Sequence, residues 1–172
     1  MGLSSRAQAG SPLQTHKVQV ANDLLWVTGE LETLGTPHNY INQDGMDFLK
    51  LNDPHIVPWA FSGLPSSHAP LIVLSRNRIQ LMIFTQEESL ATFRPAPKTG
   101  LVMLHLPLAI VRGNVPFLGE AKVHNFLDFW KGLFFPVTDA EMYFLAGGAE
   151  QLPTQARLIY VNRHLLQSYI GG

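Results

Sequence analysis

Apolar and polar residues alternate along short segments of the chain, and clusters of Gly, Asn, Asp and Pro separate these segments. Such alternation, with many β-branched and aromatic residues, predicts β-strands, because successive side chains of a strand face opposite sides of a sheet. The strands are predicted at 18–21, 24–31, 48–51, 55–61, 71–74 and 79–84, and again at 101–106, 109–117, 133–137, 141–145, 158–161 and 165–170. A short helix is expected to begin at His38/Asn39 and another at His124/Asn125, where asparagine is a good N-cap.

The two sets of predicted strands are similar in sequence, with the same residues in the same order. At an offset of 84, later 86 and then 87 residues, the matched pairs include Gly29/Gly113, His38/His124, Phe48/Phe134, Asp53/Asp139, Arg76/Arg163 and Gln80/Gln167. We therefore predict a tandem duplication. The fold class is expected to be mainly β (α+β), with two small β modules related by a pseudo-twofold axis, each with one short helix. A single module of this size buries too little surface to be stable alone, so the two are expected to pack face to face and share one core.

The duplication divides the chain into four predicted parts. Residues 1–15 are expected to form a disordered N-terminal tail, 16–84 the first module, 85–100 a linker and 101–170 the second module. Pro95 and Pro97 predict an extended conformation for the linker, since proline disfavours a helix at its own position and at the one before it.

Short motifs in both modules resemble a group of small bacterial proteins of unknown function. That group carries the pattern G-x-L…L-S-D-[FY]-L-N…F-[IL]-P-L-T-D-A…V-N, and the segments that carry the likeness here are 27–31, 48–53, 70–76, 123–128, 134–140 and 159–163. The second module is the closer match, because Lys50, Asn52 and Pro54 depart from the pattern in the first. The resemblance implies a fold and brings no established activity. A looser likeness to Sm-like barrels implies binding of RNA or protein.

Composition excludes several classes of function. The chain has 172 residues, of which 46% are hydrophobic and 15% charged, a net charge of −1 and no cysteine. Disulfides and cysteine-based metal or catalytic sites are therefore excluded. The chain also lacks the excess of basic residues that favours binding to nucleic acid. The N-terminus lacks the apolar region of a signal peptide, and no apolar run is long enough to cross a bilayer, so we expect a cytoplasmic protein without membrane insertion. The low charge fraction suggests that a partner covers some apolar surface.

Candidate chemistry is sparse, and we predict no enzyme, no cofactor and no metal. His38 and His124 are equivalent positions that could approach each other at the pseudo-axis, but the spacing of a zinc site is missing. Asp53 and Asp139 are more consistent with turn residues than with a catalytic carboxylate pair. Arginines near the hairpin turns could contact phosphate, or serve only as exposed charges at sheet edges: Arg76, Arg78, Arg157 and Arg163.

The modules differ most after the shared helix start, where Gln43 and Asp44 of the first correspond to Phe129 and Trp130 of the second. A helix this short cannot bury every neighbouring aromatic residue on one face, so part of this surface is expected to bind a protein partner or a second copy of the chain. The predicted contact residues are Phe126, Phe129, Trp130, Phe134 and Phe135.

We therefore predict a non-catalytic interaction or assembly module of a bacterial cytoplasmic protein. Alternatives are a nucleic-acid-binding small barrel, a small-ligand or metal-binding protein with a site between the modules, or a patch that the linker simply covers.

Overall fold

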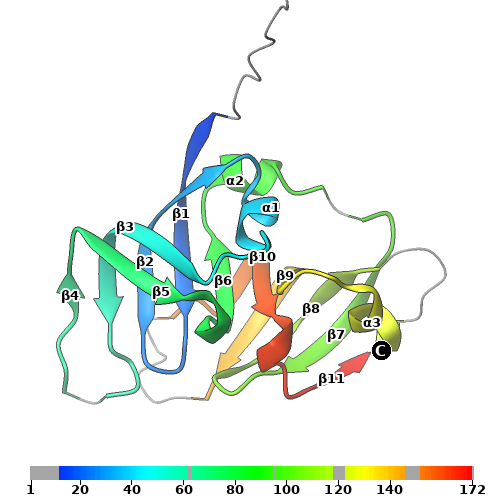
Figure 1. The fold of residues 1–172 in the computed structure, drawn as a ribbon. Helices are drawn as coiled ribbons and strands as arrows, with labels where there is room; N and C mark the ends of the chain where they lie inside the picture. The colour runs from blue at the N-terminus through cyan, green and yellow to red at the C-terminus, as the bar shows by residue number, and fades with distance from the viewer. Residues whose placement is uncertain (1–11, 62, 95, 118–122, 146–151, 172) are drawn as a thin grey trace, which may run out of the picture.

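The described residues form a mainly β structure built on one antiparallel sheet. The computed structural model describes residues 12–61, 63–94, 96–117, 123–145 and 152–171. The strands of the first half are β1 (Leu13–Ala21), β2 (Trp26–Leu34), β3 (Phe48–Val57), β4 (Ser67–His68), β5 (Leu71–Ser75) and β6 (Leu81–Phe84). Those of the second half are β7 (Thr99–His105), β8 (Ala109–Pro116), β9 (Phe134–Phe144), β10 (Gln155–Asn162) and β11 (Ser168–Gly171). Figure 1 shows the two halves side by side, with the helices α1 (Pro37–Ile41), α2 (Glu87–Ala91) and α3 (Phe126–Phe129) around them.

The strand pairing of the first half is repeated in the second, and the chain has the mainly β fold that the sequence predicts. The pseudo-twofold axis between the modules stays a prediction. β1 pairs with β2, β2 with β3, β3 with β5, and β6 returns to pair with β1. β7, β8, β9, β10 and β11 take the same places in the same order. The registers agree residue by residue: Val18 lies opposite Gly29 as Val102 lies opposite Gly113, and Phe48 lies opposite Ser75 as Phe134 lies opposite Asn162.

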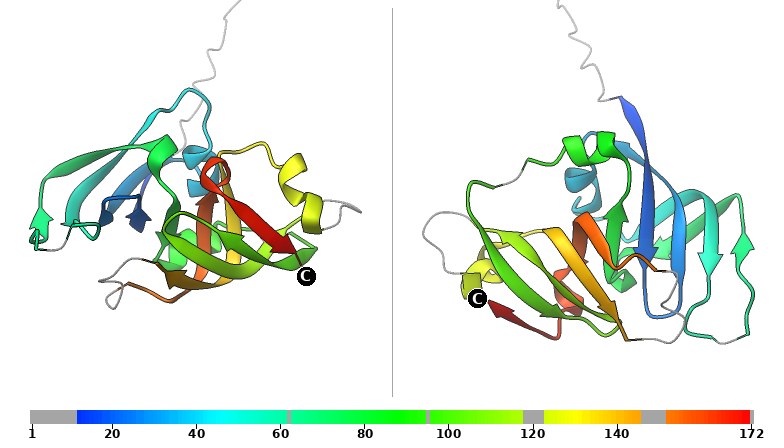
Figure 2. Two further views of the ribbon diagram at one scale, coloured as in Figure 1. Left: turned by 90° about the horizontal axis from the view of Figure 1, so that it is seen from below. Right: turned by 180° about the vertical axis from the view of Figure 1, so that it is seen from behind.

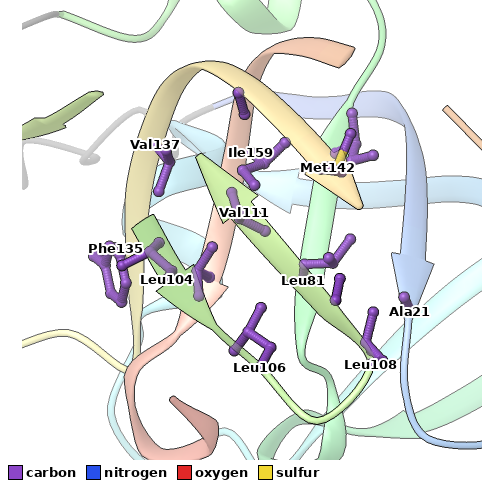
Figure 3. Packing of buried hydrophobic residues seen from close by; sticks show 14 of the residues in the cluster. Ala21, Leu81, Leu104, Leu106, Leu108, Val111, Phe135, Val137, Met142 and Ile159 are labelled. Atoms are coloured by element: carbon purple, nitrogen blue, oxygen red, sulfur yellow. The ribbon is translucent and has the colours of Figure 1, made fainter. Parts of the chain in front are cut away.

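The modules are joined edge to edge, which differs from the predicted face-to-face packing. β10 pairs with β6, so the order of strands in the sheet is β11-β7-β8-β9-β10-β6-β1-β2-β3-β4. β5 also pairs with β3, nearer the start of that strand than β4 does. The buried residues form two clusters, and each draws side chains from both modules. Figure 3 shows Ala21 and Leu81 of the first module among the core residues of the second. In the other cluster Phe134, Leu158 and Tyr160 of the second module pack into the first.

Two predicted turns lie inside continuous strands. Asp53 and Asp139 are the non-glycine residues with positive φ in the described chain, at 45° and 50°. Each lies within one long strand, β3 or β9, whose register with its neighbour shifts close by. The Asn-Asp and Thr-Asp dipeptides mark β-bulges, because a residue with positive φ bends a strand without reversing it.

Two further boundaries differ from the prediction. β1 begins at Leu13, because Leu13 to Thr15 pair with Leu34 to Glu32, so part of the predicted tail is strand. Thr36 rather than Asn39 is the N-cap of α1: its side-chain oxygen accepts from the Asn39 N–H at 3.4 Å, and Pro37 takes the first helical position. The predicted linker contains α2, which sequence reasoning missed.

Candidate functional site

Burial divides the predicted contact residues into two groups. Phe126, Phe134 and Phe135 are buried. Phe134 and Phe135 therefore do not lie on a binding surface, whereas Phe126 lines the cleft described below. The Phe126 and Phe135 rings meet edge to face at 5.2 Å within the core of the second module, and Phe134 packs into the core of the first. Phe129 is 62% exposed and Trp130 is half-buried, so these two remain available to a partner.

The aromatic residues near α3 line a cleft between the two modules. Its volume is about 180 Å³, and its lining comes from α1, the linker, the end of β8 and α3: His38, Phe93, Arg94, Ala96, Pro116, Phe117, Phe126, Phe129 and Trp130. The linker therefore forms one wall of the cleft and leaves Phe129 exposed. Figures 1 and 2 show α1 next to the second module, while α3 lies on the outer side of that module.

Hydrogen bonds between side chains and the Phe134 backbone hold the Trp130 side of the cleft in place. The Trp130 indole Nε1 donates to the Phe134 carbonyl at 3.1 Å. Asn42, at the end of α1, also binds the Phe134 backbone: its Nδ2 donates to the carbonyl at 3.0 Å, and its Oδ1 accepts from the N–H at 2.7 Å. Trp130 thus serves the module junction as well as the cleft wall, whereas the Phe129 side chain has no group that hydrogen-bonds and is largely exposed.

His38 packs between aromatic rings at the junction. Its ring lies 5.8 Å from Trp130, edge to face, and 5.7 Å from Tyr160. Burial lowers the pKa of His38 below its ordinary value of 6.5, so the ring is neutral at neutral pH. Its buried Nδ1 has no hydrogen-bond partner among the described residues. The predicted meeting of His38 with His124 is not decided, because the His124 side chain lies outside the described residues.

Two of the predicted arginines bind backbone carbonyls. Arg76 donates to the Gln43 carbonyl after α1, and Arg163 donates to the Trp130 carbonyl after α3. These equivalent contacts satisfy carbonyl groups that a helix end leaves unpaired. Arg157 forms an exposed ion pair with Glu87 at 2.6 Å. Arg78 is exposed.

The remaining candidates for chemistry are dispersed. His55 and His68 stack at 4.6 Å as a cross-strand pair of β3 and β4. No hydrogen bond or ion pair of the described residues joins Asp53 to Asp139. Within the described ranges, no group of three or more His, Asp or Glu side chains is placed to hold a metal ion.

Sequence reasoning missed a buried polar cluster at His16, where β1, β2 and α2 meet. The imidazole Nδ1 lies 2.7 Å from Ser89 Oγ, and Nε2 lies 3.0 Å from Thr33 Oγ1. Thr33 gives its hydroxyl hydrogen to the Gly35 carbonyl, so Nε2 carries the proton and Nδ1 accepts from Ser89. This cluster fixes α2 against the first module and thereby positions the linker wall of the cleft. Because the sequence placed residue 15 in the tail and began the first strand at 18, no pattern there indicated a buried histidine.

Comparison with known proteins adds no relative to this picture. Neither family models nor curated proteins nor solved structures gave a match to the chain. The resemblance drawn from the sequence motifs therefore stays a prediction. In the described part of the chain, no helix has the length and apolar character needed to cross a membrane.

Proposed function

We propose that the chain is a non-catalytic protein-interaction module of a bacterial cytoplasmic protein, and that the cleft beside α3 receives an apolar side chain of a partner. The observation that carries the proposal is Phe129, which is 62% exposed beside an aromatic cleft with a fixed wall. Exposed aromatic residues around a preformed hollow are typical anchors of protein interfaces.

The size and the lining of the cleft favour a protein side chain over a small molecule or cofactor. About 180 Å³ lies below the roughly 300–1,000 Å³ of most small-molecule pockets. Arg94 is exposed at its rim, so an acidic group next to the apolar anchor would find a charge partner there. We therefore expect a partner segment with an aromatic or branched aliphatic residue beside a carboxylate.

A selection of random peptides displayed on phage tests this proposal without a known partner. Against the unmodified chain, we expect enrichment of peptides with an apolar anchor next to Asp, Glu or a free C-terminus. Phe129→Ala should lose at least tenfold in affinity for the selected peptides, measured by fluorescence anisotropy. Tyr143→Ala, at another exposed aromatic residue, is the matched control and should bind as the unmodified chain does.

The variants also separate binding from folding. Trp130→Ala removes an indole that holds the Phe134 carbonyl, so it should lower the melting temperature, while Phe129→Ala should not. Failure to enrich any peptide whose binding depends on Phe129 would contradict the proposed function. Selective binding of small aromatic compounds in place of peptides would favour the ligand-binding alternative.

A further inference from the structure

The two modules have the same fold, yet one face of the β3–β5 pair differs in burial from the equivalent face of the β9–β10 pair. Phe134 is 0% exposed, whereas its counterpart Phe48 is 58% exposed. Tyr160 is 2% exposed, whereas its counterpart Val73 is 50% exposed. The reason is that β10 of the second module is covered by the first module, while β5 of the first has no such cover in this structure.

The cover of the second module is supplied by β6. This strand pairs antiparallel with β10, with Met82 opposite Tyr160, and the Asn162 N–H donates to the Gln80 carbonyl at 3.0 Å. Gln80 is fully buried at the junction, where its side-chain oxygen accepts from the Leu108 N–H at 3.1 Å. β6 thus docks as a strand beside β10 and fills the space next to the turn between β7 and β8.

The counterpart of β6 in the second module is β11, and its surface is open. Ile170 is 60% exposed, whereas its equivalent Ile83 is buried. Gln167 is exposed, whereas its equivalent Gln80 is buried. Among the described strands, β11 pairs with β7 alone and forms one end of the sheet. β5 lies at the other end, where it pairs with β3 as β4 does (Figure 1).

A groove lies beside β5, in the place that β6 fills next to β10. Its volume is about 490 Å³, and it runs between the β1–β2 turn and β5: Asn22, Asp23, Leu24, Leu25, Ile72, Val73, Leu74, Ser75 and Arg78. An exposed strand edge with a row of unpaired backbone groups is a template for an added strand.

We propose that β11 of one copy of this chain docks on β5 of a second copy, as an antiparallel strand in this groove. The contact repeats between chains the β6–β10 junction that the chain contains within itself. If β5 and β11 pair in the same register as β10 and β6, Ile72 lies opposite Ile170 and Val73 lies opposite Tyr169. The Ser75 N–H then donates to the Gln167 carbonyl, as the Asn162 N–H donates to the Gln80 carbonyl. The inference concerns a surface away from the α3 cleft and does not rest on the proposed function.

One departure from the repeat determines the strength of this contact. Within the chain, the Asn162 side chain adds a hydrogen bond from Nδ2 to the Ile79 carbonyl at 2.9 Å. Its counterpart Ser75 is too short for the same reach. The junction between chains is therefore weaker than the internal one, and association depends on protein concentration.

Disulfide trapping tests the contact directly, because the chain has no cysteine of its own. Chains with Ile72→Cys are mixed with chains with Ile170→Cys, oxidised mildly and separated without reductant. Opposed residues of paired strands have Cα atoms about 4.5–5.5 Å apart, within disulfide range, so a mixed dimer should exceed both homodimers severalfold. Val73→Cys mixed with Ile170→Cys is the control, since these side chains would face opposite sides of the sheet and should give no such excess.

Two further measurements complete the test. In sedimentation velocity, the mass of the unmodified chain should rise with protein concentration. Val73→Lys and Ile170→Lys should each abolish this rise. Leu34→Lys, at an exposed residue elsewhere, is the control and should leave the rise unchanged. Phe129→Ala should still associate, which separates this surface from the cleft. A chain that stays monomeric at all concentrations and gives no excess of mixed dimer overturns the proposal. So does a fast-migrating intramolecular disulfide in a third variant that carries both Ile72→Cys and Ile170→Cys, because the two edges of one chain would then close on each other.

Discussion

At the scale of single residues, the repeat is clearest where the backbone adopts a conformation that few residues tolerate. Asp53 and Asp139 have φ values of 45° and 50° at equivalent bulges. Asp and Asn reach this region more easily than other L-residues, and β-branched side chains are genuine outliers there. Each Asp was predicted from the sequence as a turn residue. The predicted turn was wrong, because each residue lies within a strand, and the choice between a turn and a bulge depends on the neighbouring strand.

Substitutions at Asp53 should follow the cost of positive φ. Asp53→Gly should change the free energy of unfolding by less than about 0.5 kcal/mol, because glycine adopts positive φ freely. Asp53→Val should cost about 1–3 kcal/mol, because a β-branched residue is strained at this backbone conformation. Chemical denaturation of both variants checks the order. Equal stability of the Gly and Val variants would contradict a bulge that requires positive φ.

His16 is a second residue whose environment determines a measurable property. Burial lowers its pKa below 6.5, and the neutral ring fits between two hydroxyl groups. The unfolded chain, with a pKa near 6.5, therefore binds more protons than the native state below that pH. Stability is complete above about pH 6.5 and falls as the pH drops further, with His38 acting in the same direction.

Urea denaturation between pH 7.5 and 5 should show this dependence. The slope is limited to about 1.4 kcal/mol per pH unit for each proton. His16→Gln should lose about 1–3 kcal/mol at pH 7.5, since hydroxyl groups of the cluster lose their partner, and its pH dependence should be shallower. His164→Gln, at an exposed histidine, is the control and should match the unmodified chain. An unchanged slope in His16→Gln would show that another group carries the effect.

At the scale of elements, the bulges explain why both modules keep a glycine in β2 and β8. A Cβ at Gly113 would lie 2.6 Å from Val137 Cγ1 and 3.0 Å from the Thr138 carbonyl oxygen. At Gly29 the closest atom would be the Asn52 carbonyl oxygen, at 3.1 Å. Both glycines allow close approach of the neighbouring bulged strand, which is the typical reason for glycine inside a strand.

Replacing these two glycines with alanine should lower the free energy of unfolding by different amounts. Gly113→Ala should destabilise by about 1–3 kcal/mol, since the added methyl overlaps a buried side chain and the β9 backbone. Gly29→Ala should cost less, because its closest contacts are several tenths of an ångström longer. Thermal unfolding of the two variants gives the comparison, and a reversed order would mean that the β2 bulge is the less adaptable of the two.

The elements also show what local sequence could and could not predict. The order of strands follows from alternation and turn residues, because those signals lie within a few residues of each other. The start of β1 at Leu13 depends on pairing with β2, and α2 depends on the link between Ser89 and His16 seventy-three residues away. Of the predicted contact residues, Phe134 and Phe135 are buried by distant strands, which no local pattern reveals.

At the scale of the whole molecule, the pseudo-symmetry is incomplete, and this asymmetry has energetic consequences. The pattern of each module was predictable, but the direction in which one module covers the other was not, since the two have nearly the same strand pattern. Phe134 and Phe48 are therefore the most informative pair, with equal chemistry, equal register and opposite burial.

Alanine substitutions at Phe134 and Phe48 should distinguish the stability of the single chain from the stability gained by association of two chains. Phe134→Ala should cost about 3–5 kcal/mol, because the ring is fully buried and its loss leaves a cavity at the module junction. Phe48→Ala should cost less than about 1 kcal/mol in dilute solution, where the ring faces solvent. At high protein concentration, Phe48→Ala should lower the melting temperature by more than it does in dilute solution. The reason is that docking of β11 would bury the Phe48 ring of the unmodified chain, and the variant lacks this ring. A Phe48→Ala effect that is independent of concentration would argue that this face stays uncovered, whereas equal costs at both positions in dilute solution would mean that the single chain already covers it.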